Sequence, residues 1–405
     1  MKILVTGAAI LAIAIAPRTA GAIPTCDTLD NPIYLQVGAT QSNLMLALGR
    51  VLRDNTANPM TLVFITNGSC TNISVMYTGA PVITATMTYV PSIAENPTWT
   101  LTTPALTCTP PGTGVLPDIG NSAVFNSACT TATPPATLAL EIGPRQAYVL
   151  AVPKASVTET AITYDEAYFL FGFGPTILQQ MNAAIAPWTD ETQLFIQPVT
   201  KSTLLGWAAN IGVPAGSWHG TSETSGTTGV ISALEGAANP NTAIGILGDE
   251  VYDPLRAQLN ILAFKAQDQY AAYYPDSTST SRDKANIRDG HYTVWSPTVW
   301  MYNIDGNGNP ITPNAKYVVD MIAGLDVTPA PNFDPTVVVA SVGVVPDCAM
   351  RVQRSFEGGP LSLYKPTLSC TCKFEAAVET TTCATCTATS PCASGVCRDG
   401  YCEEF

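Results

Sequence analysis

At 405 residues the chain is long enough for two ordinary domains and a further segment. It carries 18 Lys and Arg against 31 Asp and Glu, a net charge of −13. This balance argues against nucleic acid and against an anionic membrane surface as partners. A local anion site stays open, because backbone N–H groups at a helix N-terminus bind anions without side-chain charge.

The N-terminal residues 1–22 have the pattern of a signal peptide. Lys2 supplies the positive start, Ile3 to Ala16 form an apolar run, and Ala20-Gly21-Ala22 fit a small-x-small cleavage site. The run is shorter than the roughly 20 apolar residues that span a bilayer. We therefore expect an exported protein without a membrane span in the mature chain.

From Asn31 to about Leu325, strand-like and helix-like segments alternate. The predicted strands are Ile33 to Val37, Thr61 to Thr66, Gln146 to Val152, Ala243 to Leu247 and Trp295 to Asn303. The predicted helices are Gln41 to Arg53, Thr200 to Ile211, Thr228 to Gly236 and Asn314 to Ala323. The first helix has apolar residues at the i, i+4, i+7, i+8 spacing of one buried face: Leu44, Leu48, Val51 and Leu52.

Alternating strands and helices predict an α/β fold with a largely parallel sheet. Ligands of such sheets lie beyond the carboxyl ends of the strands. We expect residues 23–145 and 295–345 to form one domain and 146–294 a second, with a strand at Gln146 to Pro153 crossing between them. Past Leu325 the helical pattern stops: the chain is proline-rich (Pro329, Pro331, Pro335), then β-branched over Val337 to Val345.

Twelve cysteines in an exported chain predict disulfides. They are Cys26, Cys70, Cys108, Cys129, Cys348, Cys370, Cys372, Cys383, Cys386, Cys392, Cys397 and Cys402. The last eight define a cysteine-rich module over 346–405. Their spacing along the sequence does not determine which of them pair. Cys383-x-x-Cys386 would also suit zinc, but export favours disulfides. Among the first four, Cys108–Cys129 would enclose the loop from Asp118 to Ala123, and Cys26–Cys70 follows by elimination.

Four potential cations cluster at Arg282, Lys284, Arg288 and His291. They would suit an acidic partner or ligand, but we favour a charged surface loop paired with Asp283 and Asp289. Asp305 to Asn309 imitates the start of a calcium loop. Its twelfth position is Lys316 instead of Glu, so a hairpin turn is the better interpretation.

The sequence has few residue patterns that are typical of catalytic or metal-binding sites. His219 and His291 are the two histidines of the chain, which nearly excludes a histidine-rich metal site and leaves few options for a Ser-His-acid triad. A Gly-x-Ser-x-Gly elbow is absent from the sequence. We therefore predict no enzyme activity, no catalytic residues, no metal and no cofactor.

Four segments match known ligand loops in order and rough spacing. They are Gly38 to Gln41, Gly68-Ser69, Asp118 to Ala123, and Gln197 to Thr203. Together they resemble the ligand loops of the periplasmic phosphate-binding proteins that serve bacterial ABC importers. Thr228-Gly229-Val230, Ala243-Ile244-Gly245 and Trp295 to Thr298 extend the resemblance over about residues 30 to 325.

The resemblance implies a two-domain type 2 periplasmic-binding-protein fold with an interdomain cleft, here followed by a small disulfide-rich tail. It also implies a bacterial protein, periplasmic or secreted, with an ABC importer or a cell-surface component as partner. The ligand would be a small polar or anionic molecule, enclosed by hinge closure. The implied ligand-binding residues are Thr40, Gln41, Ser69, Asn121, Ser122, Gln197, Lys201, Ser202 and Thr203.

Two residues depart from the family pattern. Ala123 stands where the family carries Asp, and Gln197 stands where it carries Arg, so the charged contacts that select phosphate are missing together. Lys201, at a family Ser position, would either restore one cation or point to solvent. The outcomes are a different polar ligand, a weak anion site, or a structural or interaction protein that reuses the scaffold.

A second Ser-Gly-Thr occurs in Ser225-Gly226-Thr227-Thr228, with Thr221 at its Arg position. We prefer the Gln197 to Thr203 placement because it keeps the downstream spacing. The alternative segment is better explained as a helix start, where a hydroxyl caps a backbone N–H.

Overall fold

The structure is a computed structural model that describes residues 23–156, 158–325, 334–389 and 392–403. The expected signal peptide and the prolines at 329 and 331 lie outside these residues. The main sheet has eleven strands in the order β4-β3-β2-β1-β5-β13-β6-β10-β8-β9, with β11 also paired to β6. Their bounds are β4 (Leu106–Cys108), β3 (Met87–Tyr89), β2 (Thr61–Asn67), β1 (Pro32–Gly38), β5 (Ile119–Ser122), β13 (Trp295–Asn303), β6 (Leu138–Pro153), β10 (Ile244–Gly248), β8 (Leu194–Ile196), β9 (Thr221–Ser222) and β11 (Leu259–Ile261).

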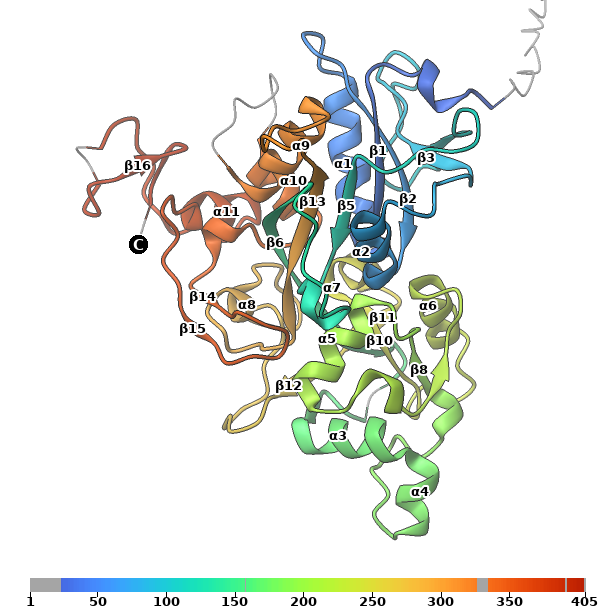
Figure 1. Ribbon diagram of the computed structural model, residues 1–405. Coiled ribbons are helices and arrows are strands. Elements are labelled where there is room, and N and C mark those ends of the chain that lie inside the picture. The colour runs from blue at the N-terminus through green and yellow to red at the C-terminus, as the bar shows by residue number, and fades with distance from the viewer. Residues whose placement is uncertain (1–22, 157, 326–333, 390–391, 404–405) are drawn as a thin grey trace, which may run out of the picture.

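The 16-residue strand β6 joins the two halves of this sheet. Its first part pairs antiparallel with β13, up to Ala147 opposite Trp295. Its second part pairs antiparallel with β10, starting at Tyr148 opposite Gly248. We call the half from β4 to β5, with its covering helices, the first lobe, and the half from β10 to β9 the second lobe (Figure 1). The strands predicted in each half, including the one at Gln146, are confirmed.

Helices cover both lobes. Their bounds are α1 (Ser42–Arg53), α2 (Ser69–Thr78), α3 (Tyr164–Phe173), α4 (Pro175–Gln180), α5 (Ser202–Ile211), α6 (Thr227–Glu235), α7 (Asp249–Tyr252), α8 (Ala285–Arg288), α9 (Pro313–Ala323), α10 (Pro335–Ser341) and α11 (Thr371–Ala377). Short 3-10 turns are η1 (Cys26–Thr28), η2 (Ala39–Gln41), η3 (Asn126–Ala128), η4 (Glu191–Gln193), η5 (Ala215–Ser217), η6 (Asp253–Leu255) and η7 (Asp347–Ala349). Two-stranded sheets pair β7 (Ala161–Thr163) with β12 (Ala263–Lys265), β14 (Val352–Gln353) with β15 (Ser362–Leu363), and β16 (Cys397–Arg398) with β17 (Tyr401–Cys402).

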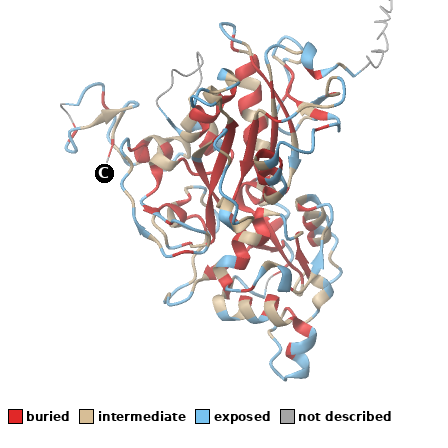
Figure 2. Ribbon diagram, viewed as in Figure 1, coloured by how far each residue is buried: buried red, intermediate tan, exposed pale blue. Residues whose placement is uncertain are grey.

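Each lobe has its own hydrophobic core, and Figure 2 shows the buried residues following the central strands. In the first lobe the predicted face of α1 is confirmed, because Leu44, Leu48 and Leu52 are buried. In the second lobe Trp207 meets Phe264 edge to face, with ring centroids 5.1 Å apart. Among the described residues, helices fall short of the length and apolarity that crossing a membrane requires.

The segment after residue 334 differs from the prediction. We expected the helical pattern to have ended by there, yet α10 forms over Pro335–Ser341. The Asp334 carboxylate accepts a hydrogen bond from Val337 N at 3.2 Å, and Pro335 occupies the first turn. Capping together with burial of Val339 outweighs the preference of β-branched residues for strands, which depends on packing context.

All twelve cysteines form disulfides, which confirms that prediction and excludes the zinc alternative at Cys383 and Cys386. The pairs are Cys26–Cys108, Cys70–Cys129, Cys348–Cys370, Cys372–Cys383, Cys386–Cys397 and Cys392–Cys402.

The predicted pairs Cys108–Cys129 and Cys26–Cys70 are wrong. Cys26 N donates to Thr109 O at 2.9 Å, which holds the N-terminal turn beside the strand that carries Cys108. Long-range backbone pairing, and not closeness along the chain, decides the partners.

The tail beyond residue 346 packs against the second lobe. Met350 and Phe374 belong to the same buried cluster as Trp207 and Trp295. The helix α11 and the β14–β15 hairpin therefore share the core of that lobe, while the four cysteines of the two last disulfides lie farther along the tail (Figure 1).

The predicted charged surface loop at 282–291 is largely wrong. Lys284 is 1% exposed, and its Nζ lies 2.8 Å from carboxylate oxygens of both Asp249 and Asp253. Arg288 is also buried and pairs with Glu375. Of the predicted partners, Asp289 does pair with His291.

The two turn predictions have different outcomes. Residues 305–309 form the expected turn, because Asp305 Oδ1 accepts hydrogen bonds from Asn307 N and Asn309 N, each at 2.9 Å. The hydroxyl cap expected at Ser225 to Thr228 is wrong, because α6 starts after Gly226 without a side-chain cap.

Candidate functional site

Three predicted loops of the first lobe meet at one edge of the sheet. β1 runs parallel to both β2 and β5, so the carboxyl ends of these strands lie together. Ser69 Oγ accepts a hydrogen bond from Ala123 N at 3.1 Å. Asn121 Oδ1 accepts one from Gly38 N at 3.4 Å. The first-lobe residues of the predicted site are thus brought together, and all of them are buried: Thr40, Gln41, Ser69, Asn121 and Ser122.

The second-lobe loop follows β8, which is parallel to β10. Ser202 and Thr203 begin α5 and are buried, as in a helix N-terminus that faces a ligand. Gln197 is also buried, but its Nε2 donates to Ile246 O at 3.1 Å. The Gln197 amide therefore stabilises the sheet, and Gln197 does not take the role of the arginine that the family carries at this position.

Lys201 precedes α5 and is half-buried. The end of its side chain lies against Gly226, where a Cβ would be 3.7 Å from Nζ. Burial lowers the pKa of Lys201. The ammonium group of Lys201 therefore lies beside the start of α6.

The loops of the two lobes touch each other. Cys70 N donates to Thr200 O at 3.3 Å. A Cβ at Gly68 would lie 2.7 Å from the same oxygen, so only glycine permits this approach. Tyr148 of β6 donates its hydroxyl hydrogen to Ala123 O. The lobes are therefore in a closed arrangement around the predicted residues.

Tyr148 is a central residue that the sequence analysis missed. Burial raises the pKa of Tyr148 well above its usual value, and hydrogen bonds with Ser202 and Ser296 act in the opposite direction. Its phenol thus links the first-lobe loop at Ala123 to the N-terminus of α5. The strand containing Tyr148 was predicted, but its side-chain direction depends on the pairing of β6 with β10 and β13.

Four buried polar atoms at this interface have no hydrogen-bond partner among the described residues. They are Thr40 Oγ1, Gln41 Oε1, Gln146 Nε2 and Thr203 Oγ1. Buried polar groups are nearly always hydrogen-bonded, because desolvating them without a partner costs free energy. These atoms come from both lobes and from the joining strand, and they are the groups that a bound polar molecule would satisfy.

A carboxylate from the tail, that of Glu357, lies beside the loop in which Ala123 stands where the family carries Asp. Glu357 Oε1 accepts a hydrogen bond from Ser296 Oγ at 2.5 Å, and its Oε2 accepts one from Phe125 N at 3.3 Å. Burial raises the pKa of Glu357, while Ser296 and Arg354 lower it. The tail therefore brings an acid close to Ala123, a contact that no local sequence pattern signals.

Arg354 extends this contact to the second lobe. Its guanidinium lies 4.4 Å from the centroid of a Trp295 ring and donates to Thr293 O at 2.7 Å and Asn210 Oδ1 at 3.5 Å. Burial lowers the pKa of Arg354 to about 10. Residues 354–357, which we call the strap, thus touch both lobes and the strand between them.

Replacing Glu357 with alanine is expected to reduce the free energy of unfolding by about 1–2 kcal/mol, because Phe125 N and Ser296 Oγ lose their acceptor. Urea unfolding followed by tryptophan fluorescence measures the loss. Glu235→Ala, at an exposed position of α6, is the matched control and should change stability little. Equal midpoints for the two variants would contradict a structural role for the strap.

Comparison with solved structures supports the fold. One match is a protein from Clostridium perfringens described as a phosphate ABC transporter substrate-binding protein with bound phosphate, at 10% identity and a TM-score of 0.50, covering 78% of this chain and 99% of that one. An ABC-type phosphate transport receptor from Vibrio cholerae matches at 12% identity and a TM-score of 0.47, covering 78% and 100%. A scan against protein-family models gave no match, and a search of curated proteins gave none either.

Proposed function

We propose that this chain, which has the two-domain fold of the type 2 periplasmic binding proteins, is an exported solute-binding protein that holds a small polar ligand between its lobes. The contacts would come from Thr40, Gln41, Ser69, Asn121, Ser122, Gln197, Lys201, Ser202 and Thr203. The observation that carries the proposal is the set of unpartnered buried oxygens of Thr40, Gln41 and Thr203, which come from both lobes. No covalent chemistry is part of the proposal.

The ligand is proposed to differ from phosphate. The methyl side chain of Ala123 cannot accept a hydrogen bond from a protonated phosphate oxygen, and Gln197 donates to Ile246 O instead of providing a positive charge. Glu357 adds a carboxylate next to the same loop, which disfavours an anion by like-charge repulsion. The Clostridium perfringens protein binds phosphate by its description, but at 10% identity it informs only the fold.

We also propose a domain organisation, a location and a partner for this chain. Residues 23–145 with 295–345 would form one domain, 146–294 the second, and 346–405 an appended module. Residues 1–22 would direct export to the periplasm or the cell exterior of a bacterium. An ABC importer or a cell-surface component would be the partner.

Thermal-shift screening with phosphate, sulfate, molybdate and neutral sugars tests the proposal. A ligand at 100 times its Kd stabilises the folded state by about 2.7 kcal/mol, which gives a clear rise in Tm. We expect a response to a neutral compound of this panel and none to phosphate. Thr203→Val, which removes one unpartnered hydroxyl, should weaken binding about tenfold, since one hydrogen bond contributes about 1.4 kcal/mol. Thr221→Val, at an exposed site on β9, is the control and should bind normally.

A structural or interaction protein that reuses the scaffold is the second candidate. The strap favours it, because Glu357 and Arg354 tie both lobes together, whereas a hinged binding protein opens and closes. A flat thermal response to the whole panel would contradict the first proposal and favour this one.

A further inference from the structure

The helices α3 and α4 project from the second lobe, at the end of the molecule away from the first lobe (Figure 1). Gly174, with φ +79°, forms the turn between them. A Cβ there would lie 2.6 Å from His219 Nδ1 and 2.8 Å from Glu191 Oε2, so the turn requires glycine. The two helices are therefore held at a fixed turn and present a defined outer surface.

The inner face of this helix pair packs into the core of the lobe. Leu170 and Phe171 are buried in the cluster that contains Trp207, and Leu178 is buried as well. The Phe171 ring stacks on Trp218, with ring centroids 4.5 Å apart. Burial of these side chains holds the helices in place.

A second set of apolar side chains occurs at every fourth position and faces outward. The set is Phe169, Phe173, Ile177 and Met181, which we call the apolar ridge. Phe169 is 44% exposed, Ile177 39% and Met181 63%, and Figure 2 shows the exposed surface of α4. The rings of Phe169 and Phe173 lie 5.6 Å apart, and Tyr168 is within 6.1 Å of both. Exposed apolar surface of this kind marks a contact with a partner or a membrane.

The chain segment that carries the apolar ridge is uncharged. From Ala167 to Thr189 the sequence has no Asp, Glu, Lys, Arg or His, and between Lys154 and Lys201 it has no basic residue. The acids that precede the segment, at 165 and 166, lie in the first turn of α3, at the end away from Gly174. The ridge therefore offers an apolar surface without a charged group among its own residues.

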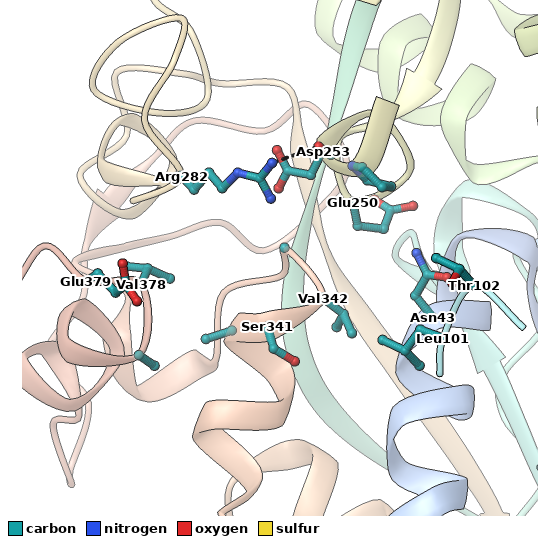
Figure 3. Close-up of a pocket in the computed structure, with 14 residues that line it drawn as sticks. Asn43, Leu101, Thr102, Glu250, Asp253, Arg282, Ser341, Val342, Val378 and Glu379 are labelled. Carbon is teal, nitrogen blue, oxygen red and sulfur yellow. Dashed lines mark hydrogen bonds between the residues drawn. The ribbon is translucent and has the colours of Figure 1, made fainter. Parts of the chain in front are cut away.

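The cavity drawn in Figure 3, of about 530 Å³, has a different composition. There Leu101, Val342 and Val378 are accompanied by Asp253 and Arg282. Arg282 donates to the Asp253 backbone oxygen at 3.3 Å, as the dashed line in Figure 3 shows. Covering such a surface with hydrocarbon would remove charged groups from water, which is costly. Segment 167–189 brings no such cost.

We propose that the apolar ridge inserts into the surface of an electrically neutral lipid membrane. Transfer of phenylalanine, isoleucine and methionine side chains out of water is favourable, and no charge of segment 167–189 is desolvated with them. Tyr164 and Tyr168, stacked with ring centroids 6.3 Å apart, lie on the same helix as the start of the ridge. Tyrosine is enriched at the boundary between lipid and water, because its ring is apolar and its hydroxyl is polar.

Shape and charge favour a neutral lipid surface over other occupants. A stable protein interface takes roughly 20–30 residues from each partner, whereas the apolar ridge occupies two short helices that project from the lobe (Figure 1). An anionic headgroup would find no basic residue between Lys154 and Lys201, and the net charge of −13 would be repelled by an anionic surface. Membrane attachment through the ridge does not depend on a ligand between the lobes.

Flotation of the chain from Ile23 onward, without the expected signal peptide, with phosphatidylcholine vesicles tests the proposal. We expect the protein to float with these vesicles and to bind less when phosphatidylglycerol is added to them. Ile177→Glu combined with Met181→Glu places two charges at exposed positions and should lower the partition coefficient at least tenfold. Leu363→Glu, at a position of β15 that is 90% exposed, is the matched control and should bind as the unmodified chain does.

A dye at a single position gives a second readout that needs no charged variant. All twelve cysteines are in disulfides, so Met181→Cys provides one free thiol for an environment-sensitive dye. The emission of this dye should shift to shorter wavelength with phosphatidylcholine vesicles, whereas a dye attached to the Leu363→Cys variant should not respond.

Three results would overturn the proposal: no flotation of the unmodified chain with phosphatidylcholine, binding only to vesicles that contain phosphatidylglycerol, or ridge variants that float as well as Leu363→Glu. Sedimentation that shows a dimer of the unmodified chain, dissociated by Ile177→Glu with Met181→Glu, would also overturn it, because the ridge would then contact a second copy of the chain.

Discussion

Replacing Lys284 with methionine is expected to reduce the free energy of unfolding by about 3–5 kcal/mol, because it removes the shared counter-charge of a buried acidic cluster. Lys284 Nζ lies within 3.3 Å of carboxylate oxygens of Asp249, Asp253 and Asp276. Arg256 contacts the last two but not Asp249. Burial raises the pKa of Asp249 to about 7 in spite of the ammonium. Asp249 is thus the carboxylate with the least compensation.

Urea unfolding at neutral pH measures this loss. Arg351→Met removes one positive charge from an exposed side chain and should change stability by less than about 1 kcal/mol. Adding Asp249→Asn to Lys284→Met should restore part of the loss, since one uncompensated carboxylate is then removed. A Lys284→Met protein as stable as the Arg351→Met control would show that the cluster is solvated and not buried.

Replacing Cys70 and Cys129 together with serine is expected to cost about 4 kcal/mol by the loop-entropy estimate, since the bridge spans 59 residues. Cys70 follows Ser69, whose hydroxyl accepts from Ala123 N, so the bridge also holds two predicted ligand loops together. We expect weaker binding of any cleft ligand in addition to the lower stability.

The matched control is Cys386→Ser with Cys397→Ser, a bridge that spans 11 residues in the tail. It should cost about 3 kcal/mol by the same estimate and leave cleft binding unchanged. Non-reducing peptide mapping of the unmodified protein checks the pairing directly. A Cys108–Cys129 peptide in that map would contradict the structure and restore the prediction made from the sequence.

Local features of the fold were predictable because they depend on residues close in the chain. The apolar spacing of Leu44, Leu48 and Leu52 marks α1 and the face that it buries. The alternation of such helices with apolar strands predicts a largely parallel sheet. The sheet is instead mixed, because β6 and β13 pair antiparallel with their neighbours. The parallel pairing of β1 with β2 and β5 still brings the loops that follow these strands to one edge. This reasoning predicts that the loops after Val37 and Thr66 lie together, whereas Asn121 is joined to them only by the resemblance to the phosphate-binding proteins.

Features that join distant segments were not predictable in this way. The cations at Lys284 and Arg288 were expected on the surface, because their sequence neighbours include Asp283 and Asp289. Their main partners are Asp249 and Glu375, which the fold brings from far along the chain. The disulfide pairs failed for the same reason.

The sequence by itself determined the main strands and helices between Asn31 and Leu325, the buried face of α1 and the disulfide chemistry of the cysteines, and its resemblance to the phosphate-binding proteins indicated the loss of charge at Ala123 and Gln197. Only the tertiary structure decided which groups stand near those positions: Tyr148 from the joining strand and Glu357 from the tail. The physical reason is the distance along the chain over which each kind of interaction acts. Backbone propensity and hydrophobic periodicity act within a few residues, whereas desolvation, charge pairing and hydrogen-bond satisfaction depend on every atom brought close by folding.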